Sequence, residues 1–142
     1  MIQINVDRAS TIYYYPDWKK RLLHPELEGL GPATYDLSEL EQWLHPDQKN
    51  MTGQEIYEYL IVHEMLGSCL GLEDCVVIQR QMNTAALREL YGETTPAFWR
   101  SVMESEYGEL WVPCLGTRHG STIWTPLKMN WAGKPALRVS AA

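Results

Sequence analysis

Apolar positions recur with helical spacing in the middle of the chain. Over residues 53–66, side chains such as Ile56 and Leu60 lie four positions apart, as they do on one face of an amphipathic helix. Ile61 and Val62 add apolar side chains to the opposite side of the same segment. A helix that is apolar around so much of its circumference is expected to be central in the packing.

Capping residues predict where the helices begin. Thr52 and Glu55 have the three-residue separation of a capping box, and Gly67 follows the segment as a C-terminal stop. Pro16 is favoured at the first position of a helix, and Asp36 suits an N-cap. The other expected helices are residues 17–23, 36–44, 73–81 and 84–91, although the apolar run at 75–78 would also suit a buried strand. Early strands are expected at residues 2–6 and 11–15.

The pattern changes after Pro96 to short β-prone runs separated by turn residues. Their spacing predicts an antiparallel meander. Pro113 and Pro126 should face outward at an edge or a bulge, because proline cannot donate to a ladder. The expected strands are residues 98–103, 109–115, 121–127 and 136–139.

These elements favour an α+β fold. A chain of 142 residues has the length of one domain, so a single domain is expected over residues 1–142. We expect a helical N-terminal and central part, residues 16–92, packed on a C-terminal antiparallel β-meander of about four short strands within residues 96–140. The chain has no apolar run long enough for a membrane span and no signal-peptide pattern at its start. We therefore expect a cytoplasmic protein without a membrane partner.

Charge is distributed unevenly along the chain. The net charge is −6, and residues 36–75 carry nine acidic side chains against Lys49 alone. Residues 110–142 carry four basic side chains and no acidic one. A negative net charge disfavours direct binding to nucleic acid, which depends on Lys and Arg. Acidic helix faces often contact only solvent, but spaced carboxylates can also attract a basic protein partner.

Tryptophan and tyrosine are abundant, with six Trp and eight Tyr against one Phe. Both residue types are enriched in interface hot spots, although they also build cores. If helices cover only one face of the meander, some tryptophans would cover an edge or form an interaction surface. Residues 13–21 combine tyrosines with basic side chains, as single-strand nucleic-acid sites do, but the alternating tyrosines of a half-buried strand explain this composition better.

The cysteines and histidines provide the most concrete candidate catalytic groups, because a carboxylate pair such as Glu55 and Glu58, one helical turn apart on the surface, usually contacts only solvent. Cys69, Cys75 and Cys114 are odd in number and contain no CxxC pair, which favours a reducing compartment. Cys114 with His119, or Cys69 with His63, would supply the thiol and base of a small cysteine-dependent hydrolase or transferase. The chain has no nucleotide-binding motif, and a glycine stands where a zincin helix has its second histidine. We therefore expect neither a cofactor nor a metal.

The leading hypothesis is a small acidic, non-enzymatic protein that acts by stoichiometric protein–protein binding, as an inhibitor, adaptor or accessory factor. One version is a nucleic-acid mimic of the phage or mobile-element anti-defence type, which would occupy the groove of a basic nucleic-acid-handling protein. The cysteine enzyme and a structural subunit of a larger assembly are the alternatives, and the oligomeric state is open. The candidate partner-binding residues are Glu39, Glu41, Glu55, Glu58, Glu64, Trp43 and Trp111.

Overall fold

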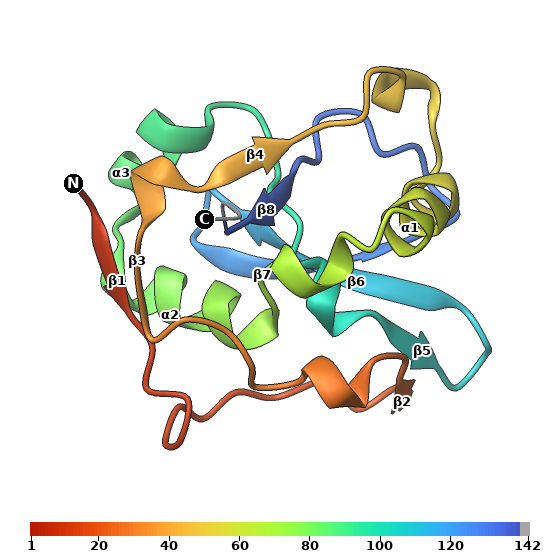
Figure 1. Ribbon diagram of the computed structural model, residues 1–142, viewed down its shortest axis with the longest axis horizontal. Coiled ribbons are helices and arrows are strands. Elements are labelled where there is room, and N and C mark those ends of the chain that lie inside the picture. The colour runs from red at the N-terminus through yellow and green to blue at the C-terminus, as the bar shows by residue number, and fades with distance from the viewer. Residues whose placement is uncertain (140–142) are drawn as a thin grey trace.

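The computed structural model describes residues 1–139, which form three α-helices and eight β-strands (Figure 1). Residues 140–142, which include the ends of the expected β-rich part and of the expected domain, lie outside the described residues. The helices are α1 (Gly53–Val62), α2 (Leu72–Gln81) and α3 (Thr84–Tyr91). The strands are β1 (Gln3–Asn5), β2 (Lys19–Leu22), β3 (Thr34–Asp36), β4 (Glu41–Trp43), β5 (Met103–Ser105), β6 (Leu110–Gly116), β7 (Ser121–Pro126) and β8 (Ala136–Arg138).

The strands form one four-stranded sheet and two separate pairs. The sheet has the order β2-β5-β6-β7, the pairs are β1-β3 and β4-β8, and all these neighbours are antiparallel. The β6–β7 hairpin runs from Trp111 opposite Pro126 to Gly116 opposite Ser121. Ala97 links the β4–β8 pair to the sheet, because it forms isolated bridges to both β6 and β8.

Helices cover both faces of the central strands. One cluster of buried side chains contains Ile56 and Leu60 of α1 together with Val112 of β6. A second cluster contains Ile78 of α2 together with Leu115 of β6. Figure 1 accordingly shows α1 on one side of β6 and β7, and α2 on the other. The tryptophans are therefore not left on a bare sheet face, and none of the six is among the exposed large hydrophobic residues.

The predicted C-terminal meander packed on helices is wrong. The fold is α+β, but its strands are spread along the chain, and β1 to β4 all precede the first α-helix. Two of these early strands pair with late ones, β2 with β5 and β4 with β8. Strands of three or four residues carry little local signal, because their conformation is fixed by main-chain pairing with distant segments.

Residues 36–44 show this effect most clearly. Asp36 does cap a helical turn by accepting a backbone hydrogen bond at 3.0 Å, but the turn is a single 3₁₀ turn, Leu37–Glu39. The chain then extends into β4, and Glu41 forms an ion pair with Arg138 of β8 at 3.1 Å. The long-range ladder outweighs a helical pattern that was only local.

The segment before it differs from the prediction as well. Residues 17–23 contain β2 instead of a helix, because the main chain pairs with β5, and Arg21 forms an ion pair with Glu104 at 2.7 Å. Residues 11–15 are not in a strand, although Tyr14 is exposed and the tyrosines on either side are partly buried. The earlier expected strand is confirmed as β1.

The three α-helices are confirmed. Thr52 and Glu55 form the predicted capping box, with each side chain accepting a hydrogen bond from the other residue's amide, at 3.3 and 3.1 Å. However, α1 ends at Val62 and not before Gly67, because Glu64 adopts a left-handed backbone conformation with φ of +53° and turns the chain. The helices α2 and α3 occupy the predicted segments.

The late strands β6, β7 and β8 also lie where they were expected, but β5 begins only at Met103, after the 3₁₀ turn Trp99–Ser101. Pro113 is buried in the middle of β6 and does not face outward. Its carbonyl accepts a hydrogen bond from the amide of Phe98 at 2.9 Å, on the side away from β7. The nitrogen points to the same side, so the missing N–H costs the hairpin no ladder bond. Pro126 ends β7, an edge strand, as predicted.

Candidate functional site

The outward side of α1 is partly acidic and partly apolar. Gln54, Glu58, Ile61 and Val62 lie along one stripe of the helix, and all four are exposed. Ile61 is 43% and Val62 is 74% exposed. The expectation that α1 would be central in the packing is therefore wrong, because the strands occupy the centre and α1 covers one face of them. We call this stripe the α1 face.

The inner side of α1 holds the helix in a fixed position. Ile56 and Leu60 are fully buried in the core cluster that contains Trp131. Gly53 lies so close to Trp131 that an added Cβ would collide with the indole nitrogen. That nitrogen donates a hydrogen bond to the carbonyl of Pro126 at 3.1 Å. Close packing on its inner side and a capping box at its start hold α1 in one position, and its outward side chains are held with it.

An aromatic cluster lies beside the α1 face. Tyr59 stacks on Trp43 of β4 with ring centroids 5.5 Å apart, and on His63 with centroids 3.9 Å apart. His45 contacts the edge of Tyr59 at 4.7 Å. The Nδ1 atom of His63 lies 2.9 Å from the carbonyl oxygen of Tyr59, so this imidazole is engaged at the end of the helix. The cluster therefore joins α1 to β4 and the residue pair after it.

The predicted acidic residues fall into two groups. Glu41 is paired with Arg138, and Glu55 is committed to the capping box. The other three are exposed and form no ion pair within residues 1–139: Glu39, Glu58 and Glu64. Glu58 belongs to the α1 face and Glu64 follows the C-cap residue His63, whereas Glu39 lies in the 3₁₀ turn before β4.

Trp111 does not join this surface. Its neighbour in β6, Val112, packs in the same core cluster as α1, and successive side chains of a strand point to opposite faces. Trp111 instead contacts Trp18 in an edge-to-face arrangement with centroids 4.8 Å apart, and Trp18 contacts Trp124. The prediction that Trp111 contributes to the acidic surface is therefore not supported by its position. Trp111 belongs to a tryptophan cluster on the opposite face of the sheet.

Neither predicted thiol–imidazole pair is brought together. Cys114 and Cys69 are fully buried, and each sulfur lies near a backbone carbonyl, at 3.9 and 3.5 Å. His119 and His63 are exposed, and neither forms a hydrogen bond to a cysteine among the described residues. Burial raises the pKa of the Cys114 thiol to about 11 and that of Cys69 to about 12. A nucleophilic cysteine needs the opposite, a lowered pKa and an accessible thiolate.

A buried charged network was not apparent from the sequence. Arg8 donates hydrogen bonds to Glu73 at 2.8 Å and to both carboxylate oxygens of Asp74 at 2.9 and 3.2 Å. Asp74 also accepts from the Tyr35 hydroxyl at 2.8 Å and the Gly71 amide at 3.0 Å. The Glu73 and Asp74 side chains are only 4% and 1% exposed, and burial raises the pKa of Glu73 although Arg8 opposes the shift. The network joins the N-terminal segment to α2, and both oxygens of Asp74 are already engaged.

Comparison with known proteins leaves the family open. No family model, no curated protein and no solved structure matches this chain. Within residues 1–139, no group of three or more His, Cys, Asp or Glu side chains is placed to hold a metal ion. The same part of the chain contains no helix with the length and apolar character needed to cross a bilayer.

Proposed function

We propose that this chain is a small, acidic, non-enzymatic protein that binds one basic protein partner through the α1 face. The observation that supports this most directly is the exposure of Ile61 and Val62 next to Glu58 and Glu64, two carboxylates with no cation partner within residues 1–139. Complete burial of one such aliphatic side chain contributes about 1.5–3 kcal/mol. The flanking carboxylates favour a partner whose own apolar contact is surrounded by Lys and Arg.

Charge and aromatic content support the same kind of partner. The net charge of −6 accelerates encounter with a basic protein, and complementary charges suppress incorrect partners. Trp43 and Tyr59 add the aromatic side chains that are enriched in binding hot spots. A basic nucleic-acid-handling protein is the partner class that we favour, with the chain as its inhibitor or accessory factor. The phage or mobile-element anti-defence role is one form of this proposal.

We further propose that the protein acts in the cytoplasm. All three cysteines are buried and unpaired, which is compatible with a reducing compartment and gives no sign of a disulfide framework.

Affinity capture from a host lysate, with variants of the α1 face as baits, tests the proposal. The first variant, Glu58→Lys with Glu64→Lys, reverses the two unpaired charges. The second, Val62→Gln, removes the most exposed aliphatic side chain of the face and keeps helix propensity. Glu55 is left unchanged, because its replacement would also remove the cap of α1. The matched control, Glu89→Lys with Glu106→Lys, makes the same charge change at exposed positions outside the α1 face.

We expect the wild-type bait to capture one protein in stoichiometric amount at low salt, and a smaller amount of the same protein at high salt. Both α1-face variants should lose this partner and the control should retain it, and the purified pair should reproduce that order in calorimetry. Equal capture by the wild type and both α1-face variants would refute the α1 face as the interface. Absence of any stoichiometric partner at either salt concentration would refute the binding function.

A further inference from the structure

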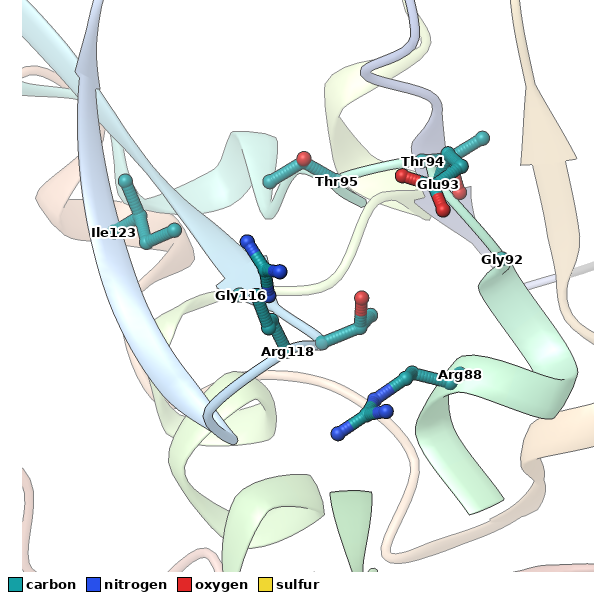
Figure 2. Close-up of a pocket in the computed structure, with 9 residues that line it drawn as sticks. Arg88, Gly92, Glu93, Thr94, Thr95, Gly116, Arg118 and Ile123 are labelled. Atoms are coloured by element: carbon teal, nitrogen blue, oxygen red, sulfur yellow. The ribbon is translucent and has the colours of Figure 1, made fainter. Parts of the chain in front are cut away.

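A polar groove lies between α3 and the β6–β7 hairpin, and it shares no residue with the α1 face. Its volume is about 360 Å³. Figure 2 shows Arg88 extending from α3 toward the hairpin turn, Arg118 extending from that turn with its guanidinium on the side of Ile123 and Thr95, and Glu93 next to Thr94. Two guanidinium groups therefore border one small cavity from different elements of the fold.

These two arginines differ from all others in the chain. The five remaining arginines each donate at least one side-chain hydrogen bond within the protein: Arg8, Arg21, Arg80, Arg100 and Arg138. Within residues 1–139, the side chains of Arg88 and Arg118 form neither a hydrogen bond nor an ion pair, and both are exposed. The two arginines without an internal partner thus line the same groove.

We propose that this groove binds a small phosphate monoester that carries hydroxyl groups, such as a sugar phosphate. Guanidinium groups bind phosphate oxygens through paired hydrogen bonds, and two of them can neutralise a phosphate dianion. Thr95 and Thr117 also line the groove, and their hydroxyls can donate to the remaining oxygens.

Glu93 explains why the ligand should carry hydroxyls as well as phosphate. Its carboxylate repels an anion, and the C-terminal end of α3 adds partial negative charge from its last carbonyls. A hydroxyl-bearing group suits the surroundings of Glu93, because it can donate to this carboxylate while the phosphate binds the guanidinium groups. The volume lies at the lower limit of small-molecule sites, which range from about 300 to 1,000 Å³.

The groove is not suited to a nucleic-acid strand. Backbone binding requires a continuous track of cations, whereas the groove contributes two and the whole chain has a net charge of −6. Ile123 provides one apolar wall, on which the carbon atoms of a small polyol can rest.

Isothermal titration of the full chain with ribose 5-phosphate, inorganic phosphate, ribose and succinate tests this proposal. Arg88→Gln and Arg118→Gln should each weaken the binding of ribose 5-phosphate about tenfold or more, as expected for the loss of a hydrogen bond to a charged group. Lys20→Gln removes the same charge from an exposed side chain on β2, at the other edge of the sheet from β7, and should leave the affinity unchanged. Glu93→Gln should weaken ribose 5-phosphate relative to inorganic phosphate.

Backbone amide shifts in an NMR titration provide a readout that does not depend on the variants. Ribose 5-phosphate should shift the amide signals of Thr95 and Thr117. As a separate control, unchanged melting temperatures should show that the variants are folded. The proposal is overturned if ribose 5-phosphate does not bind, if ribose or succinate binds as tightly, or if inorganic phosphate matches it in affinity. Equal weakening by Lys20→Gln, or shifts confined to other parts of the protein, would overturn it as well.

Discussion

Replacement of Arg8 by methionine should destabilise the fold far more than replacement of an exposed arginine. The substitution removes four hydrogen bonds, three to Glu73 and Asp74 and one to the carbonyl of Pro32 at 2.7 Å. It leaves two carboxylates whose side chains are 4% and 1% exposed without their cation. Breaking a buried ion pair from one side costs about 3–5 kcal/mol. For a chain of this length, that loss lowers Tm by about 10 °C or more.

The size of this effect should depend on pH. Burial already raises the pKa of Glu73 above its ordinary value of 4.5 while Arg8 is present. Without Arg8, the folded-state pKa of this carboxylate rises further, so the folded variant binds more protons than the unfolded chain. The stability of the variant therefore falls as pH rises through that higher pKa. The difference in stability between wild type and variant should therefore be smaller near about pH 4.5 than near about pH 8.

Urea unfolding followed by tryptophan fluorescence measures the loss at both pH values. Arg21→Met is the matched control, because Arg21 pairs with Glu104 but its side chain is 62% exposed. An exposed pair of this kind contributes about 1 kcal/mol or less. If the two variants lost the same free energy of unfolding at high pH, or if the loss in Arg8→Met did not grow with pH, the buried network would not stabilise the fold as described.

Three further predictions concern local packing and the thiols. Gly53→Ala places a Cβ against the Trp131 indole and should cost about 1–3 kcal/mol in a thermal or urea melt, and an unchanged melt would contradict the contact. Thr52→Ala removes the cap of α1 and should cost about 1 kcal/mol, which Thr52→Ser should restore. All three cysteines should react slowly with a neutral-pH thiol reagent until the chain is unfolded, and one rapidly labelled cysteine would revive the cysteine-enzyme hypothesis.

The elements that could be predicted from the sequence are those whose signals are local. Thr52 and Glu55 lie within one turn of each other, and so do Asn83 and Ala86, whose amide donates to the Asn83 side chain at 2.8 Å at the start of α3. β2 and β4 were predicted as helices because their partners, β5 and β8, lie far along the chain. A helical pattern of four or five apolar residues cannot reveal such pairing.

The candidate site was predicted in part for the same reason. Glu58, Glu64 and Trp43 were identified from charge and residue type, and they lie on or near the α1 face. The exposure of Ile61 and Val62 could not be predicted, because it depends on which layer of the fold receives α1. Arg8 and Asp74 are 66 residues apart, so sequence spacing could not reveal their ion pair. The unpartnered state of the two groove arginines could not be predicted either, because it depends on the hydrogen-bond partners that the fold gives to each arginine.

The position of β8 affects how the protein is made. This strand pairs with β4, bridges to Ala97, and its Leu137 carbonyl accepts a hydrogen bond from Leu70 at 3.1 Å. None of these contacts can form before residues 136–138 have left the ribosome, and Arg138 lies 97 residues after its partner Glu41. Contacts of such long sequence separation also slow folding. The growing chain therefore carries β4 and the segment around Ala97 without their β8 partner until residues 136–138 are free to pair.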